Sequence, residues 1–549
     1  MANTLVSIVT VLAALGPGSE PSAPCNESIR QQDLKADLYF LAGDAFQGRL
    51  TGTAGNNLAA EFIASRFERL GLKRVGSDGS YFQQFLLSTA TLGPSNKLEV
   101  TRDDVTLRFR AGQDFVPLPF SPSAEVRNSL AFAGFGISDP ERGHDDYRNV
   151  DVRDKIVLVL AHEPGENDPK SPFDGLVMSE ASTLLRKVLT AQEKGADGVL
   201  IVSDVHNHPE PENFEALAHD LWPEKPPRIP HYTLQGWAER VRIPAAMIST
   251  GLARTLLRGG KSSFEAMARS SERPRNGSNG MIEGARITLA TDVSRHVVPD
   301  RNVVAALEGC DPKLKDEWVV ISCHLDHNGA DGDRIYNGAD DNGSGTVGLL
   351  EIAEAYALAA QQGHRPKRSV LFAAFDSEER GLLGAYAFVE RPLMPLDRIV
   401  AVLNMDMIGR NEEVPVGGGS RFRGLAIQSA ESNRNALNLL GHSYSPSLTR
   451  TIEQSSALFG LTLKQDLDNN VSNLLRRSDH WPFLQRGVPA VFFHTGLHPD
   501  YHTPADRPEK IEYAKMERIV RLVHQASWDL AQQADRPRLE HETAPATSR

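Results

Sequence analysis

The chain has 549 residues, of which 40% are hydrophobic and 24% charged, a composition typical of a soluble globular protein. Lysine and arginine number 59 against 71 aspartates and glutamates, and the net charge of −12 argues against nucleic-acid binding, which needs clustered positive charge. Only three cysteines occur, Cys25, Cys310 and Cys323, which excludes a disulfide scaffold and a four-cysteine zinc module. Any metal ion must therefore be bound by histidine and carboxylate side chains.

One apolar run lies near the N-terminus, at residues 5–15, and small residues and proline follow it. The run is too short to span a bilayer but suits the hydrophobic part of a secretory signal, although no lysine or arginine precedes it. We predict that residues 1–24 are a signal peptide and that the protein is secreted or periplasmic; the alternative is an ordinary N-terminal helix. Cys25 raises lipoprotein anchoring, which Pro24 disfavours. No other segment is apolar enough to cross a membrane.

Three regions follow along the chain. Residues 30–118 contain a glycine-rich turn at 48–55 and then an amphipathic helical pattern that ends at Gly71. Residues 119–290 consist of short apolar runs separated by turn residues, which predicts a separate strand-rich domain. From about residue 297 the pattern becomes strand, loop, helix, and residues 533–549 are polar enough to predict a disordered tail.

Four apolar runs in the third region are rich in valine, isoleucine, leucine and phenylalanine and alternate little with polar residues. They lie at residues 318–323, 369–375, 399–405 and 488–493. Such runs are typical of strands buried on both faces, and a helix is predicted between the first two. The region is therefore predicted to be an α/β sandwich, in which ligands bind at the carboxyl ends of the strands.

Each of these predicted strands is followed by residues that can bind a metal ion. The residues are His324, Asp326 and His327 after the first strand, Asp376, Glu378 and Glu379 after the second, Asp406 after the third, and His494 after the fourth. Taken singly, each is more often a packed or solvated side chain. Together they would place several carboxylates at one sheet edge, where their repulsion requires a cation.

Six motifs in order resemble one family. They are GRLTGTAG at 48–55, HLDH at 324–327, GADDNGSG at 338–345, FDSEERGLLGA at 375–385, NMDMIG at 404–409 and HPDYHTPADRPEKI at 498–511. With them the chain resembles the dizinc, leucyl aminopeptidase-like members of peptidase family M28 over nearly its whole length. The resemblance implies a three-layer α/β/α zinc-exopeptidase domain with a mixed, mostly parallel sheet, formed by residues 30–118 and 291–532. Residues 119–290 resemble the protease-associated (PA) domain that is often inserted in this family.

The resemblance also implies a metal-ligand set. His324 and Asp406 would bind one Zn²⁺, Glu379 and His502 a second, and Asp341 would bridge them, with its peptide bond to Asn342 in the cis form. Two imidazoles and three carboxylates leave each ion an open coordination position, as catalytic zinc requires.

Three further residues receive roles from the same resemblance. Glu378, beside the ligand Glu379, would be the general base, and Asp326 would orient the imidazole of His324. Tyr501 would stabilise the oxyanion of the tetrahedral intermediate. Asp479, His480 and His498 are expected to shape the pocket rather than bind zinc.

These inferences predict an aminopeptidase that removes N-terminal residues from peptide substrates with two Zn²⁺ ions. A carboxypeptidase or dipeptidase of the same family is the main alternative, because Arg476 and Arg477 could hold a terminal carboxylate. A glutaminyl cyclase is less favoured, since five ligands suit two ions better than one, and an inactive binding protein is disfavoured by the intact ligands and Glu378. His206 and His208 could form an accessory metal site, but a solvated loop is the favoured interpretation. The sequence leaves the oligomeric state open.

Overall fold

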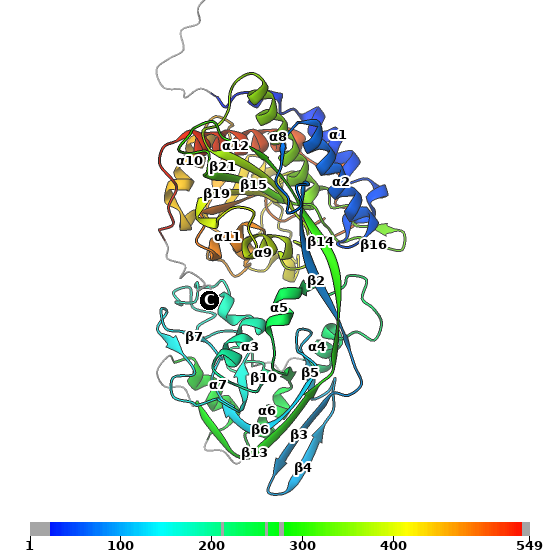
Figure 1. Ribbon diagram of the computed structural model, residues 1–549, viewed down its shortest axis with the longest axis vertical. Coiled ribbons are helices and arrows are strands. Elements are labelled where there is room, and N and C mark those ends of the chain that lie inside the picture. The colour runs from blue at the N-terminus through cyan, green and yellow to red at the C-terminus, as the bar shows by residue number, and fades with distance from the viewer. Residues whose placement is uncertain (1–21, 210–212, 259–261, 274–278, 541–549) are drawn as a thin grey trace, which may run out of the picture.

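The computed structural model describes residues 22–209, 213–258, 262–273 and 279–540, and these form two lobes stacked along the long axis (Figure 1). One lobe contains a 10-stranded sheet and the other an 8-stranded sheet. Residues 1–21 of the predicted signal peptide lie outside the described residues, as do residues 541–549 of the predicted tail. Among the described residues, no helix is both long and apolar enough to cross a membrane.

The larger sheet carries the predicted strands at its centre. Its order is β11 (Thr233–Leu234), β2 (Phe82–Leu92), β14 (Val293–Leu307), β18 (Ser369–Phe375), β15 (Trp318–His324), β19 (Ile399–Met405), β22 (Ala490–His494), β20 (Ala436–Leu440) and β21 (Thr462–Lys464), with β1 (Lys73–Arg74) paired to β14. The strands β18, β15, β19 and β22 run parallel, while β14 and β20 flank them in antiparallel pairing. The sheet is thus mixed, as predicted, and parallel in its central four strands.

Helices cover both faces of this sheet and form the predicted three layers. On one face lie α1 (Gln31–Leu41), α2 (Ala54–Arg69), α8 (Gly345–Gln361), α10 (Pro446–Ser456) and α12 (Tyr513–Gln532), and on the other lie α9 (Leu383–Glu390) and α11 (His480–Gln485). Along β15, Val319 and Ile321 pack into the first helical layer and Val320 into the second. Both faces of the strand are therefore apolar, which explains why its sequence does not alternate.

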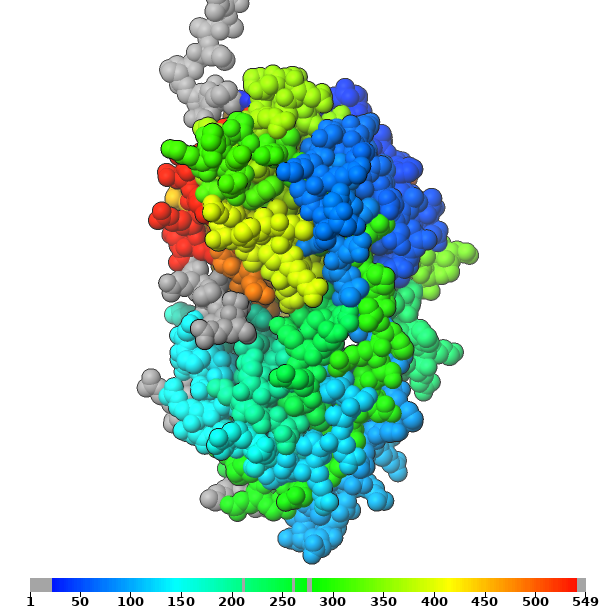
Figure 2. Space-filling view, in the orientation of Figure 1, coloured from blue at the N-terminus to red at the C-terminus, as the bar shows by residue number. Residues whose placement is uncertain are grey.

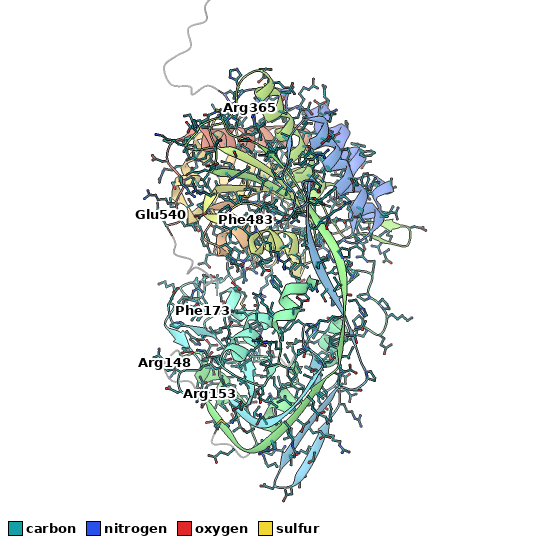
Figure 3. The ribbon with its side chains drawn as sticks, in the orientation of Figure 1. Arg148, Arg153, Phe173, Arg365, Phe483 and Glu540 are labelled. Atoms are coloured by element: carbon teal, nitrogen blue, oxygen red, sulfur yellow. The ribbon has the colours of Figure 1, made fainter. Side chains whose placement is uncertain are left out.

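The opposite layer lies between the sheet and the second lobe. In it, Phe483 of α11 packs against Phe388 of α9 with ring centroids 5.6 Å apart (Figure 3). Phe173 belongs to a different core, inside the second lobe. The two lobes thus have separate hydrophobic cores, as independent domains do.

The second lobe is built on the order β4 (Val105–Phe109), β3 (Lys97–Arg102), β13 (Gly280–Thr291), β6 (Ala124–Phe132), β9 (Ile156–Leu160), β10 (Gly198–Val202), β12 (Ala245–Ile248) and β5 (Phe115–Pro117). It is also covered by α3 (Leu184–Glu193), α4 (Phe214–Leu221), α5 (Gln235–Arg240), α6 (Thr250–Leu256) and α7 (Phe264–Ser271). Two short hairpins complete the described strands, β7 (Ser138–Asp139) with β8 (His144–Asp145) here and β16 (Ala330–Asp331) with β17 (Arg334–Ile335) in the larger lobe.

The boundary of this insertion differs from the predicted residue 119. Strands β3, β4 and β5 precede that residue but belong to the second sheet, so the insertion begins near Gly93, whose N–H donates to the carbonyl of Asp292 at 2.8 Å. The long pairing of β2 with β14 ends there, at Leu92 and Val293. Strands β3, β4 and β5 join the second sheet by pairing that includes distant segments, which local sequence patterns do not indicate.

The two lobes also exchange contacts beyond the two connecting strands. Strand β11, which lies within the insertion in sequence, pairs with β2 of the larger sheet. The indole N–H of Trp237 in α5 donates to Glu390 Oε1 at the end of α9, at 2.5 Å. The space-filling view accordingly shows the insertion, coloured cyan to green, in direct contact with the larger lobe (Figure 2).

Part of the predicted disordered tail is packed against the larger lobe. The N–H of Glu540 donates to the carbonyl of Tyr444 at 2.9 Å, and the N–H of Arg538 donates to Ser447 Oγ at 3.1 Å. Residues 533–540 thus continue the chain along the lobe, which their polar composition did not indicate.

Candidate metal centre

The predicted ligands meet at the carboxyl ends of the parallel strands. His324 is the last residue of β15, Glu379 follows β18 by four residues, and Asp406 directly follows β19. Asp341 lies in the turn of π-helical pattern at Ala339–Ser344 that leads into α8, and its peptide bond to Asn342 is cis, as the resemblance implies. His502 comes from the loop after β22. The structure brings all five predicted ligands together.

Asp341 joins two halves of this cluster. Its Oδ1 atom lies 3.3 Å from Nε2 of His324, which is also 3.3 Å from Oδ1 of Asp406. Its Oδ2 atom lies 2.9 Å from Nε2 of His502, which is 3.1 Å from Oε2 of Glu379. Each oxygen of one carboxylate therefore faces a different imidazole and a different second carboxylate, the arrangement of a bridging ligand.

The polar atoms of the cluster fit metal ligation better than hydrogen bonding. Nε2 of His324 and of His502, and Oδ1 of Asp406, are buried without a hydrogen-bond partner among the described residues, although carboxylate or imidazole atoms lie close to them. An unsatisfied buried polar atom is costly, and several that converge on one point indicate a shared cation. The donor set, imidazole nitrogen and carboxylate oxygen, is one that Zn²⁺ accepts.

His327, a metal-binding residue type after β15 but not one of the five predicted ligands, also belongs to the cluster. Its Nδ1 atom lies 2.6 Å from Oε1 of Glu379 and 3.8 Å from Oδ2 of Asp341, and the side chain is fully buried. Neither ring nitrogen has a hydrogen-bond partner among the described residues. Its position as the second histidine of the HLDH motif is the sequence feature that could have indicated its place in the cluster.

Asp326 contacts the imidazole of His324 through its backbone oxygen and the two glutamates through its carboxylate. Its Oδ1 atom is 3.7 Å from Nδ1 of His324, beyond hydrogen-bond distance, and that nitrogen instead lies 3.2 Å from the backbone oxygen of Asp326. The carboxylate accepts hydrogen bonds from the backbone N–H groups of Glu378 at 2.9 Å and Glu379 at 3.3 Å. Asp326 therefore fixes the backbone that carries the predicted base.

Ser478 and Asp479 pack beneath Asp406. The hydroxyl of Ser478 donates to Oδ2 of Asp406 at 2.7 Å, which leaves Oδ1 facing His324. Asp479 is fully buried, and neither of its carboxylate oxygens has a hydrogen-bond partner among the described residues. His480 packs against the ring of Phe492, with centroids 5.1 Å apart.

His498 and Asp506 support the turn that carries Asp341. The carboxylate of Asp506 accepts from the N–H groups of Asp340 at 3.0 Å and Asp341 at 3.1 Å. Nε2 of His498 lies 3.3 Å from Oδ2 of Asp340. His498, expected to shape the pocket, thus acts behind the ligand loop and does not line the pocket.

A small pocket opens onto the cluster. Its walls beside the ligands and Glu378 are Met407, Leu474, Arg477, Phe492, His494, Leu497 and Tyr501. The ring of Tyr501 stacks on His502 with centroids 3.8 Å apart. Of the two predicted arginines, Arg477 lines the pocket, whereas the guanidinium of Arg476 lies over the ring of Trp481 at 5.1 Å.

Glu378 and Glu379 are adjacent, but their surroundings shift their pKa values in opposite directions. Burial raises the pKa of Glu378 well above its usual value, and although His324 opposes the shift, the carboxylates of Asp406 and Glu379 add to it. Burial would also raise the pKa of Glu379, but His502 and His327 outweigh it and lower that pKa. Environments that separate two neighbouring carboxyl groups in this way are typical of an acid–base group beside a permanently charged one.

Comparison with known proteins agrees with this geometry. Residues 302–527, which include every predicted ligand, match the family model described as Peptidase family M28. This match shows a similarity to peptidase family M28 over less than half of the chain. The matched residues contain the His and carboxylate cluster, and the insertion between β2 and β14 lies outside them.

Relatives of this chain have names from two kinds of exopeptidase. "Probable glutamate carboxypeptidase AMP1" of Arabidopsis thaliana is 23% identical over 485 residues, 83% of this chain and 61% of that protein. A "Probable leucine aminopeptidase" of Trichophyton verrucosum is 25% identical over 260 residues, 46% of this chain and 62% of that protein. The chain thus spans less than two thirds of the length of these curated relatives. Among solved structures, an aminopeptidase from Aneurinibacillus sp. strain AM-1 is similar at 18% identity and a TM-score of 0.49, covering 93% of this chain and 96% of that one.

Proposed function

We propose that this chain is a dizinc aminopeptidase that hydrolyses the N-terminal residue from peptides. The observation that carries the proposal is the position of Asp341, whose two carboxylate oxygens face His324 and His502 from the two halves of the cluster. His324 and Asp406 would bind one ion, and Glu379 and His502 the other. His327 lies beside this second ion position.

The bound Zn²⁺ ions would supply Lewis acidity, which polarises the scissile carbonyl and makes a water molecule acidic enough to lose a proton near neutral pH. Glu378 accepts that proton as general base and then delivers it to the departing amine. Its raised pKa supports this role, because a carboxyl group that holds a proton readily is an effective acid in the second half of the reaction. Asp326 keeps Glu378 in place through its backbone N–H.

Tyr501, which lines the pocket, would donate a hydrogen bond to the oxyanion. Burial raises the pKa of Tyr501 well above its usual value, and the carboxylates of Asp341 and Glu379 raise it further. The phenol therefore keeps its proton at neutral pH and remains a donor. A donor directed at the developing negative charge in a buried site is worth several kcal/mol in transition-state stabilisation.

The pocket supports an amino-terminal rather than an internal cleavage site. A pocket this small accepts the end of a peptide more readily than an internal segment. Leu474, Phe492 and Leu497 form an apolar wall that suits the side chain of an apolar first residue.

A substrate panel tests the proposal. Peptides of about five residues with a free or an acetylated N-terminus, each as acid and as amide, are incubated with the full chain, and the products are followed by mass spectrometry. We expect stepwise loss of N-terminal residues from the unblocked peptides only, loss of activity with 1,10-phenanthroline, and recovery with added Zn²⁺. Shortening of acetylated peptides from the C-terminus, or activity that chelation leaves unchanged, would contradict the proposal.

Arg477 favours a second candidate, a carboxypeptidase or dipeptidase. Its guanidinium lines the pocket near Tyr501 and could pair with the terminal carboxylate of a short substrate. In that case Arg477→Gln should raise KM at least tenfold for peptide acids but not for the matching amides. The exposed Arg423→Gln is the matched control. An aminopeptidase predicts equal, small effects of Arg477→Gln on acids and amides.

Export of the protein stays a prediction. It depends on the apolar run at residues 5–15, which lies outside the described residues. Fractionation of expressing cells, with an antibody to the mature chain, would measure it.

A further inference from the structure

A second group of metal-binding side chains lies in the insertion, away from the candidate centre. It consists of His162, Glu166 and His208. The first two follow strand β9 and the third follows β10, and these strands are parallel neighbours with Leu160 opposite Val202. The cluster therefore occupies the carboxyl ends of adjacent parallel strands, where α/β folds commonly bind ligands.

The three side chains point toward one another. Nε2 of His208 lies 2.6 Å from Oε1 of Glu166, and Nδ1 of His162 lies 3.6 Å from Oε2 of the same carboxylate. The two imidazole centroids are 4.2 Å apart, and one ligand atom from each residue lies within 4.8 Å of the others. One ion could contact all three side chains after small rotamer adjustments.

The group carries unsatisfied polar atoms in a partly buried place. The Glu166 side chain is 8% exposed, whereas that of His208 is 43% exposed, so the cluster is buried on one side and open on the other. Oε1 of Glu166 and Nδ1 of His162 are buried without a hydrogen bond of acceptable geometry among the described residues.

Asp204 and Glu272 accept hydrogen bonds from the loops that carry the cluster. Oδ1 of Asp204 accepts from the N–H of His206 at 2.9 Å, and Asp204 Oδ2 accepts from the side chain of Asn207 at 2.8 Å. Glu272 accepts from the N–H of Gly165 at 2.8 Å and from the Asn207 side chain at 2.5 Å. The loop that carries Glu166 and the loop that carries His208 are thus tied to the same glutamate, which fixes the ligand positions before an ion binds.

We propose that His162, Glu166 and His208 form a metal site separate from the catalytic centre, for a divalent ion such as Zn²⁺. Two imidazoles and one carboxylate are a ligand set that Zn²⁺ binds with an open fourth position, whereas Ca²⁺ and Mg²⁺ need more oxygen ligands. The solvated-loop interpretation of His206 and His208 thus applies to His206, which is exposed and outside the cluster.

Such an ion would restrain the segment after Glu166, which contacts the larger lobe. Downstream of Glu166, the N–H of Leu176 donates to Asn469 Oδ1 at 2.8 Å, and the Asn469 side chain donates to the carbonyl of Pro169 at 3.0 Å. Asn469 lies five residues before the pocket residue Leu474. The proposed ion would therefore have a structural role, which is to stabilise the contact between the two lobes.

The metal content of matched variants tests this site. The full chain is stripped with chelator, reloaded with excess Zn²⁺ alone, passed through gel filtration and measured by elemental analysis. Wild type and His206→Ala should each retain about one more Zn²⁺ per chain than His208→Ala and Glu166→Gln. Because only the difference between variants counts, the result does not depend on how many ions the catalytic centre holds or on the proposed function.

Two further measurements complete the test. Cobalt(II) should add visible absorption in wild type that His208→Ala lacks, and a parallel loading with Ca²⁺ alone should show no difference between the variants. His208 is largely exposed, so its substitution is not expected to unfold the chain. Equal Zn²⁺ retention and equal cobalt spectra in wild type, His206→Ala and His208→Ala would show that the cluster is an ion pair only and would overturn the proposal.

Discussion

The partners of the individual carboxylate oxygens determine which role each acidic side chain can take in this site. Asp406 shows this most simply, because Ser478 occupies its Oδ2 atom and leaves Oδ1 free toward His324. Glu378 differs from its neighbour Glu379 in its imidazole contacts. His327 lies 2.6 Å from Glu379, and no imidazole among the described residues lies as close to Glu378. Position in the motif thus matters less than the partner on each oxygen.

His327 provides a prediction at this scale. His327→Gln removes an imidazole that touches Glu379, so we expect the metal ion on that side to bind about 10 to 100 times more weakly. Zinc retention in competition with a chromogenic chelator measures the change. The exposed His364→Gln serves as control, and a His327→Gln protein that retains zinc as tightly as wild type would show that His327 has no part in the site.

The sequence could predict the metal ligands but not the residues that hold these ligands in position. His324, Glu379 and Asp406 follow strongly apolar strands, and parallel strands bring their carboxyl ends to one edge. The contact of Ser478 with Asp406 joins residues 72 positions apart, and no local pattern indicates such a pairing. The same reason explains why Asp326 was assigned to the imidazole rather than to the backbone of the glutamates.

At the scale of elements, the glycine-rich turn before α2 supports the metal-binding loops. Arg49 in this turn is fully buried, and its guanidinium donates to the carbonyls of Leu325 at 2.8 Å, Asn337 at 2.7 Å and Gly338 at 2.9 Å. It therefore ties the loop after β15 to the loop that leads to Asp341. The GRLTGTAG motif was recognisable in the sequence, but its link to the centre needed the fold.

Replacing Arg49 should loosen both loops. Arg49→Met leaves several buried carbonyls without a donor, and we expect a loss of about 3 kcal/mol in the free energy of unfolding, with weaker metal retention. Urea unfolding followed by fluorescence measures the first effect. The exposed Arg30→Met is the control, and unchanged stability in Arg49→Met would contradict this role.

Helices α1, α2 and α8 meet around a charged group that makes stability depend on pH. Glu351 of α8 is buried and lies 3.8 Å from Arg66 of α2, which also pairs with Asp37 of α1. Burial raises the pKa of Glu351 to about 8, and the neighbouring carboxylates of Glu354, Asp33 and Asp37 add to the shift. The folded state thus favours the protonated form of Glu351.

The sign of this shift gives a stability prediction. Because the pKa is about 8 in the folded state against 4.5 for an ordinary glutamate, the stabilisation is complete below pH 4.5 and is lost as the pH rises through about 8. The melting temperature of wild type should therefore fall between pH 5 and pH 8.5. In Glu351→Gln this fall should be smaller by a few degrees. Glu509→Gln, at an exposed glutamate, should follow wild type. Parallel pH profiles for all three proteins would refute the assignment.

At the scale of the whole molecule, the described residues form a ten-stranded sheet with a second domain inserted between two of its paired strands. Strands β2 and β14 pair from Phe82 and Val303 to Leu92 and Val293, and the insertion leaves from their far end. The sequence predicted a separate strand-rich domain and the four central strands of the larger sheet, because apolar runs mark these strands. It could not predict that β3, β4 and β5 join the second sheet, since strand pairing between distant segments has no local signature.

The central claim is that Glu378 acts on substrate at a metal centre held by the five ligands. The most direct measurement is turnover of an unblocked peptide by wild type and Glu378→Gln, each loaded with Zn²⁺ and assayed for metal content in the same sample. We predict equal zinc content and a kcat lower by about 10³ in the variant, since the base is lost while the ligands remain. A variant that holds the same zinc and turns over at the wild-type rate would contradict the account.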